Sequence, residues 1–336
     1  MHMKKKKQDA LLDDLDRRDF LKLLGCSSLL LSVPLLPGCE DAGVRTLGSA
    51  ALVKNADDAY ALRRAISLVD GLSFLKPGDS VLLKLALNSS NPYPATTSPF
   101  VVQELVALLK EHGAGDVLVG DKSPDWQDTL NCMKETGIHD AAVSAGARIV
   151  SFEEEDMIAV QPEKATRWPG GFSMPKIFQD IDHIIVLPTL RTHQMAGFTM
   201  GMKIFVGALP QNDRYAMHRS LYFLESIAEI SLGAGNVRLS LLDARQGFNA
   251  GGPDSGDLIE PGIMIASTNL AAADAVGLAL LKAMGTTSQL SATPVWEHPT
   301  IRRGIQVHSP GLSAATLTLL SEGVENIAAI KEQLHV

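Results

Sequence analysis

The chain is short of cysteine, and its net charge has the wrong sign for generic nucleic-acid binding. Three cysteines occur among 336 residues, and two of them, Cys26 and Cys39, lie in the first 39 residues. Cys132 stands alone in the rest, which therefore has neither an internal disulfide nor a cysteine-held iron–sulfur cluster. The formal net charge is −8, and no basic face is visible beyond the N-terminal residues, which argues against nucleic acid as a partner.

Several familiar catalytic and nucleotide-binding motifs are also missing. The sequence contains no Walker loop, no G-x-G-x-x-G after the first predicted strand, no H-E-x-x-H and no G-x-S-x-G elbow. The stretch SLGAGN at 231–236 is better interpreted as a helix stop than as a dinucleotide loop. Any active centre must therefore be sought in residues that the fold brings together.

Residues 1–38 resemble a twin-arginine export signal. Arg17 and Arg18 precede Phe20-Leu21-Lys22, and a moderately apolar stretch follows to about residue 38. Glycine, serine and proline interrupt that stretch, which makes it a poor permanent membrane span. We expect an exported protein, periplasmic or at the cell surface, with the twin-arginine export machinery as a partner. Such export suggests cytoplasmic cofactor loading, although fast folding is another reason for it.

The apolar stretch ends in Leu36-Pro37-Gly38-Cys39, which resembles a lipoprotein-processing box. We expect lipidation at Cys39, and hence contact with a membrane surface, with residues 39–48 as a linker. The alternatives are an ordinary signal with an incidental cysteine, or an uncleaved anchor. Without residues 1–38 the chain keeps 23 basic and 33 acidic residues. A cluster of cations within this acidic part of the chain would therefore be unusual.

Residues 49–336 are predicted to form one α/β domain. Short runs rich in Val, Ile and Leu predict strands at 49–55, 80–87, 116–121, 147–152, 183–188 and 237–244. Helical patterns separate them, at 56–72, 98–113, 126–137, 218–233 and 269–285. This alternation predicts a mostly parallel sheet with helices on both faces. Residues 153–176 look irregular, and we expect a hairpin or a lid inserted there.

Polar residues follow or close several of the predicted strands. Ligands bind at the carboxyl ends of strands in open α/β sheets, so we expect these side chains to meet in one pocket. The strand-end residues are Lys84, Asn88, Asp121, Arg191, His193 and Asp243. The turn at Thr97-Ser98 adds hydroxyls and a helix N-terminus, where free amides favour anions. Lys203 follows a glycine-rich loop and begins another apolar helix.

The residue types suggest roles around an anionic carboxylate or phosphate. Arginine offers a fork and lysine a point charge for such groups. We assign anion binding to Lys84, Asn88, Thr97, Ser98 and Arg191, and proton transfer to His193, Lys203 and Asp121. A divalent metal would fall to Asp243 and Asp274.

Each assignment has an ordinary structural alternative. A strand-end aspartate is often a cap or turn former, and Asp274, on a helix, could be a buried partner for a basic residue. Lys84 breaks an apolar strand, so it lies on an edge strand or is paired. His218 could join the cluster, but a histidine at a helix start is usually structural. Cys132 is expected to be a small buried residue.

Taken in order, five segments resemble the family called domain of unknown function 362. They are VLLKLALN, TTSPFVVQELVALLKEHGAGDVLVGDKS, IIVLPTLRTHQMAGFTMGMKIFVGAL, LLDARQGFNAGGP and STNLAAADAVGLALL. The chain departs from the family at Arg191, where lysine is usual, and at Leu85-Ala86, where proline normally follows Lys84. Some relatives carry an added ferredoxin-like cysteine domain, which this chain lacks. The resemblance implies a fold and a choice of residues, and no reaction.

Three hypotheses follow. The first is an exported enzyme acting on a small anionic substrate, with a divalent metal as a candidate cofactor. The second is a membrane-tethered, non-catalytic protein that captures an anionic ligand or cofactor. The third is an assembly lipoprotein whose polar cluster is an internal salt-bridge network.

Overall fold

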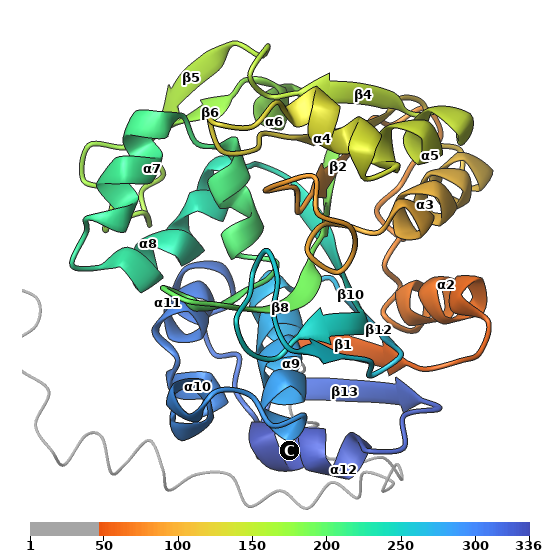
Figure 1. Ribbon diagram of the computed structural model, residues 1–336, viewed down its shortest axis with the longest axis vertical. Coiled ribbons are helices and arrows are strands. Elements are labelled where there is room, and N and C mark those ends of the chain that lie inside the picture. The colour runs from red at the N-terminus through yellow and green to blue at the C-terminus, as the bar shows by residue number, and fades with distance from the viewer. Residues whose placement is uncertain (1–46) are drawn as a thin grey trace, which may run out of the picture. The chain divides into compact units, whose positions relative to one another are not determined.

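The computed structural model describes residues 47–336, and Figure 1 shows their arrangement. The predictions about Arg17, Arg18 and Cys39, and about the export signal as a whole, lie outside the described residues. So does most of the predicted linker.

One large mixed sheet organises the described residues. Along its main path the strands follow the order β13-β1-β12-β10-β7-β2-β3-β4. These strands are β1 Gly48–Val53, β2 Val81–Leu85, β3 Val117–Asp121, β4 Arg148–Ser151, β7 His183–Leu187, β10 Val237–Phe248, β12 Ile263–Ser267 and β13 Leu317–Glu322. Strand β12 runs antiparallel to both of its neighbours, β1 and β10, and the other pairs on this path are parallel.

Helices cover both faces of this sheet because successive strand residues face opposite ways. Leu82 of β2 belongs to one hydrophobic cluster, and Leu83 belongs to the other. The cluster around Leu83 is covered by α2 Asp58–Leu68, α3 Pro99–Glu111, α4 Thr129–Glu135 and α5 Ile138–Ser144. The cluster around Leu82 is covered by α8 Phe223–Ile230, α9 Leu270–Ala283, α11 Pro299–His308 and α12 Ile327–Leu334. Figure 1 shows α2 and α3 on one side of the sheet and α8 and α11 on the other. The predicted α/β class is confirmed.

The irregular region at 153–176 contains a hairpin. Strands β5 Met157–Val160 and β6 Phe172–Pro175 pair antiparallel in a small sheet of their own. Buried Phe172 and Trp168 pack against each other with ring centroids 5.0 Å apart. Of the two predicted forms, hairpin or lid, the hairpin is the one observed.

The polar stretch after β7 is also a hairpin, although the sequence pattern predicted no strand beyond residue 188 there. Strand β8, Thr189–His193, pairs with β9, Gly197–Thr199, and also continues alongside β10. The first four residues of β8 are buried and His193 is half-buried, so this strand carries Arg191 into the interior. Strand β11, Leu258–Ile259, is a short addition to β10.

Two helix predictions need correction. Residues 218–233 are not one helix: α7, Gln211–His218, ends where the prediction began, and α8 starts at Phe223. His218 therefore closes a helix instead of opening one. The apolar segment after Lys203 is a 3₁₀ helix, η1 Lys203–Ala208. The remaining short elements are α6 Ile177–Asp180, α10 Ser288–Ala292, η2 Ser231–Gly233 and η3 Val295–Glu297.

Candidate functional site

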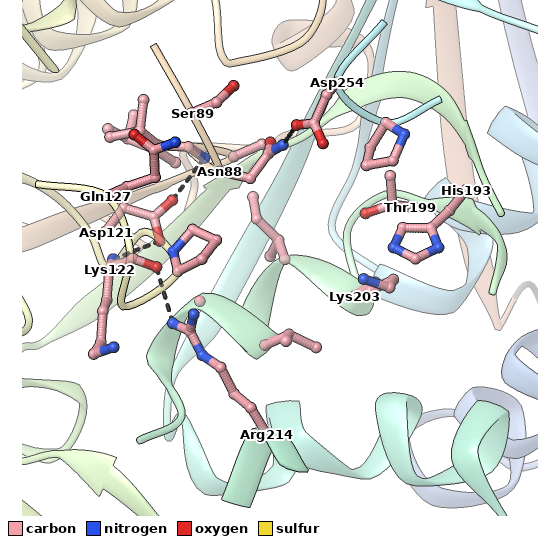
Figure 2. Close-up of a pocket in the computed structure, with 18 of the residues that line it drawn as sticks. Asn88, Ser89, Asp121, Lys122, Gln127, His193, Thr199, Lys203, Arg214 and Asp254 are labelled. Atoms are coloured by element: carbon pink, nitrogen blue, oxygen red, sulfur yellow. Dashed lines mark hydrogen bonds between the residues drawn. The ribbon is translucent and has the colours of Figure 1, made fainter. Parts of the chain in front are cut away.

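A cavity of about 570 Å³ opens at the carboxyl ends of β2, β3 and β7. Its walls come from the loop after β2, the end of β3, the β8–β9 hairpin, η1, α7 and the loop after β10. Figure 2 shows the labelled side chains around this space. Of the predicted site residues, the cavity brings together Asn88, Asp121, Arg191, His193 and Lys203. Of the six strand-end residues, Asn88, Asp121, Arg191 and His193 line the cavity, and Lys84 and Asp243 do not.

Lys84 and Asp121 form a buried ion pair at the floor. Lys84 Nζ lies 2.6 Å from Asp121 Oδ1 and donates to the carbonyl of Leu85 at 2.8 Å. Backbone amides of Lys122 and Leu87 also donate to Asp121, at 2.7 and 2.9 Å. Burial raises the pKa of Asp121 to about 6, and the Lys84 ammonium opposes that rise. Lys84 is fully buried and does not line the cavity, so its predicted contact with an anion is replaced by pairing with Asp121.

Arg191 is a buried guanidinium without an ion-pair partner in the described residues. Its Nη1 donates to Asn88 Oδ1 at 3.1 Å, to the carbonyl of Pro253 at 3.2 Å and to the carbonyl of Ala95. Its Nε is buried with no hydrogen-bond partner in the described part of the chain. Burial lowers the pKa of Arg191 to about 10, and the nearby Asp254 opposes the shift. A charge kept from water without an anion is costly, so an incoming anion would relieve that cost.

His193 is held in one tautomer by its own hairpin. Its Nδ1 accepts backbone amides from Met195 at 3.1 Å and Ala196 at 3.2 Å. In the neutral ring the proton must therefore lie on Nε2. Burial, followed by the charges of Lys203 and Arg191, lowers the pKa of His193 to about 2. His193 therefore presents a neutral N–H donor, because protonating Nδ1 would oppose both amides.

Lys203 lies at the start of η1, beside His193 in Figure 2. Burial lowers its pKa to about 7, and the charges of Arg191 and Arg214 act in the same direction. Lys203 makes no salt bridge or hydrogen bond with the described residues. Its ammonium can therefore both hold an anion and exchange a proton near neutral pH.

Arg214 of α7 is a cavity residue that the sequence analysis missed. Its guanidinium donates to three carbonyl groups, of Leu209 at 2.9 Å, Lys122 at 3.0 Å and Ser123 at 3.2 Å. Three carbonyl acceptors leave the charge without a carboxylate in contact. Arg214 thus adds a second buried cation to Arg191, beside the half-buried Lys203, while it ties α7 to the segment after β3.

His218 and Asp254 complete the polar lining. His218 Nδ1 lies 2.7 Å from the carbonyl of Arg214, so Nδ1 carries the proton and Nε2 is an acceptor. Asp254 is exposed and accepts a hydrogen bond from Asn88. His218 was named as a residue that could join the cluster, with a structural role at a helix start as the alternative, and it lines the cavity. Asp254 gave no signal because it lies in an irregular loop.

Thr97 and Ser98 do not line the cavity, which corrects their assignment to anion binding. Thr97 Oγ1 accepts from the amide of Ala86 at 2.8 Å and donates to the carbonyl of Leu187 at 2.7 Å. Its hydroxyl joins the loop after β2 to β7. Ser98 Oγ accepts from Arg245 Nη2 at 3.1 Å. Both hydroxyls are thus engaged in holding the scaffold.

Asp243 and Asp274, assigned to a metal, have other partners and do not line the cavity. Arg245 Nη2 donates to Asp243 Oδ2 at 2.8 Å, and Tyr93 OH donates to Oδ1 at 2.9 Å. Asp274 accepts the amides of Gly201 at 2.7 Å and Met202 at 2.9 Å. Within residues 47–336, no group of three or more His, Cys, Asp or Glu residues is arranged to hold a metal ion. We therefore no longer assign these two carboxylates to metal binding.

The sheet and the cation-lined cavity define an α/β protein with a cavity at the carboxyl edge of its strands. A family model described as Domain of unknown function (DUF362) matches residues 81–279. That match covers more than half of the chain, and the chain belongs to this family. It includes the cavity residues from Asn88 to Asp254.

The chain is also similar to the thylakoid-associated protein sll1697 of Synechocystis sp.. The two are 29% identical over 224 residues, which is 64% of this chain and 67% of the relative. As for membrane crossing, residues 47–336 contain no helix of sufficient length and apolar character.

Proposed function

We propose that this protein binds a small anionic ligand in the cavity and acts on it as an enzyme. The observation that carries the proposal is that three of the cations lining the cavity, Arg191, Lys203 and Arg214, form no salt bridge with a described carboxylate. The fourth, Lys122, is paired with Asp125, and the whole chain has a net charge of −8. Buried cations normally have partners, and a bound anion would supply one.

The geometry supports distinct roles for the side chains. Arg191 and Lys203 would hold the anion, and the Nε2–H of His193 would donate to an oxygen on which negative charge develops. A neutral imidazole donor suits this task because it does not lose its proton to the ligand. The groups suited to proton transfer are Lys203, with its pKa near 7, and His218, whose Nε2 has no hydrogen-bond partner in the described part of the chain. Asp121 would be a positioning residue, since three donors already surround its oxygens.

A divalent metal, if one takes part, would enter together with the ligand. Magnesium commonly binds through one or two carboxylates plus the phosphates of a substrate. Asp254 is the exposed carboxylate of the cavity lining, and within residues 47–336 its carboxylate accepts a hydrogen bond from Asn88 alone. It is therefore the residue we propose for contact with such an ion.

The second candidate is a non-catalytic protein that captures an anionic ligand or cofactor. The low pKa of His193 favours it, because a ring fixed as a neutral donor is a poor acid or base. In such a protein the same cations would hold the ligand, and the ligand would be released chemically unchanged. The alternative of a purely internal salt-bridge network has less support. Among the described residues Lys84 is paired with Asp121 and Lys122 with Asp125, but Arg191, Lys203 and Arg214 have no carboxylate partner.

We also propose that the protein works outside the cytoplasm, tethered to a membrane through Cys39. The support is the resemblance of residues 1–38 to an export signal, together with the word thylakoid-associated in the name of a relative. The intact mass of the mature protein would show cleavage and lipidation directly.

The test of the binding proposal is calorimetry with pyrophosphate and with malonate. We expect at least one of them to bind, and Lys203→Met to weaken that binding at least tenfold. Lys134→Met, which removes an exposed lysine of α4, is the matched control. Binding that survives Lys203→Met unchanged, or no binding of either anion, contradicts the proposal. Mass spectrometry of any ligand carried through purification then separates the enzyme, which alters it, from the non-catalytic protein.

A further inference from the structure

The cavity has two chemically different regions. Its deep part contains the buried guanidinium groups of Arg191 and Arg214, which are 3% and 8% exposed. Its mouth contains two aromatic rings, Trp126 and Tyr215, which are 76% and 53% exposed. The proposed anion site accounts for the deep part only. The rings at the mouth require a separate explanation.

We propose that the ligand carries a planar aromatic ring joined to its anionic group, and that this ring stacks at the mouth on Trp126 and Tyr215. This inference rests on the proposed anion site and adds the class of ligand. A large apolar ring exposed to water beside a binding site is a common contact for a ligand. Bases stack on such rings without sequence preference, because every base has an aromatic face.

Both rings stand on segments that the protein holds in place. The amide of Gln127 donates to the carbonyl of Pro124 at 2.8 Å, which closes a turn around Trp126. Tyr215 follows Arg214, whose guanidinium donates to the carbonyl groups of Lys122 and Ser123. Arg214 thus links α7 to the segment that leads into the Trp126 turn. The two rings therefore belong to wall segments that Arg214 joins, and their exposure is not that of a loose chain end.

The mouth also offers groups that could bind the edge of a heterocyclic ring. Side-chain amides of Asn91, Gln127 and Gln211 line the cavity. The Oε1 of Gln127 accepts only a weak contact, from Cys132 Sγ at 3.7 Å, and its amide nitrogen has no partner in the described residues. The volume of about 570 Å³ is within the usual range for small-molecule and cofactor sites and far exceeds the needs of a bare phosphate. Side-chain amides at the mouth and cations in the deep part of the cavity would together suit a ligand that joins a ring to acidic groups.

Two pairs of probes separate the ring from the anion. Pyrophosphate is compared with ADP, and malonate with benzene-1,2-dicarboxylate, by calorimetry on the purified protein. We expect the ring-bearing member of at least one pair to bind about tenfold or more tightly than its partner, as stacking contributions suggest. Trp126→Ala should remove most of that advantage and leave the ring-free anion within about twofold. Leu221→Ala, which truncates a 99% exposed side chain outside the cavity, is the matched control.

The outcomes distinguish the two proposals. If the ring-free anions bind and the ring adds nothing in either pair, the aromatic-ligand inference is overturned and the anion site stands. The same holds if Trp126→Ala leaves the advantage of the ring intact. If none of the four probes binds, the anion site fails and this inference fails with it. Melting temperatures of both variants show whether each has kept its fold.

Discussion

Lys84 Nζ and Asp121 Oδ1 lie 2.6 Å apart at the floor of the cavity, with both side chains almost wholly removed from solvent. The two residues belong to neighbouring parallel strands, β2 and β3. Phe152 lies beside the pair, with the Lys84 ammonium 5.8 Å from its ring centroid. The ion pair fixes the carboxylate that receives the amides of Lys122 and Leu87, and so it shapes two walls of the cavity.

Removing one member of this pair should destabilise the protein strongly. Lys84→Met leaves the Asp121 carboxylate buried without its cation, and we expect a loss of about 3–5 kcal/mol in the free energy of unfolding. The double variant Lys84→Met with Asp121→Asn should recover part of that loss, since no buried charge is then left alone. Urea unfolding measures these free energies in the double variant and in each single variant. A loss in the double variant equal to the sum of the losses in Lys84→Met and Asp121→Asn would contradict the coupling.

Gly207 should not tolerate a side chain. A Cβ at this position would collide with Asp121 Oδ1 and would lie 2.8 Å from Lys84 Nζ. We expect Gly207→Ala to cost about 1–3 kcal/mol through overpacking. Gly170→Ala is the control, because a Cβ there meets no atom within 4 Å. Thermal unfolding of the two variants should differ, and equal melting temperatures would show that η1 can shift away from the pair.

Two substitutions of His193 should separate its structural role from its binding role. His193→Ala removes the acceptor for two hairpin amides, and we expect it to cost about 1 kcal/mol of stability. His193→Asn keeps an acceptor near the Nδ1 position but lacks the donor of Nε2, so it should be nearly as stable as the parent protein. Both variants should bind the anion identified by calorimetry about tenfold more weakly. Full affinity in His193→Asn would show that the ring does not touch the ligand.

Anion binding should weaken as the pH rises through the pKa of Lys203. That pKa is lowered to about 7, first by burial and then by the charges of Arg191 and Arg214. The ammonium is therefore charged at pH 6 and largely neutral at pH 8, and we expect affinity to fall over that interval. In Lys203→Met the affinity should be low and nearly constant from pH 6 to pH 8. If affinity fell with pH equally steeply in the parent protein and in Lys203→Met, Lys203 would be excluded as the titrating group.

The stability of the protein should also depend on Asp274. Burial raises the pKa of this carboxyl to about 7, and the amides of Met202 and Gly201 oppose the shift. A raised carboxyl pKa means that the folded state binds the proton more tightly than the unfolded state. The contribution of Asp274 to the free energy of unfolding is complete below the ordinary carboxyl pKa near 4. It is lost as the pH rises to about 7, with a slope of about 1.4 kcal/mol per pH unit.

Asp274→Asn should remove that contribution to the pH profile of unfolding. Asp121, whose pKa is raised to about 6, remains in the variant and keeps its own slope below that value. The difference between the two profiles therefore isolates Asp274. Identical profiles between pH 4 and pH 7 would show that Asp274 does not titrate there.

The alternation of apolar strands and helices was enough to predict the sheet and its two covered faces. The meeting of Asp121, Arg191 and His193 was expected from one rule about the carboxyl ends of strands. For Lys84 the apolar strand left two alternatives, an edge strand or a partner, and the contact with Asp121 decides between them. These expectations depend on local pattern, which a single sequence displays.

The remaining features depend on contacts between distant segments. Arg214 is recognisable as a cavity residue only after α7 packs against the carbonyl groups of Lys122 and Ser123. Thr97 could not be removed from the site by pattern alone, since the direction of its hydroxyl depends on the position of Leu187. The pattern also could not show that Asp243 already has partners. Its contact with Arg245 depends on the geometry of β10, and its contact with Tyr93 joins residues 150 positions apart.

The uncompensated guanidinium of Arg191 has a consequence for how the protein would respond to salt. Dissolved ions screen exposed charges within about 10 Å at moderate ionic strength, but they screen buried ones much less. A ligand that reaches Arg191 would therefore be held by an attraction that sodium chloride scarcely weakens. A basic surface patch, in contrast, would release the same ligand as the buffer became more concentrated.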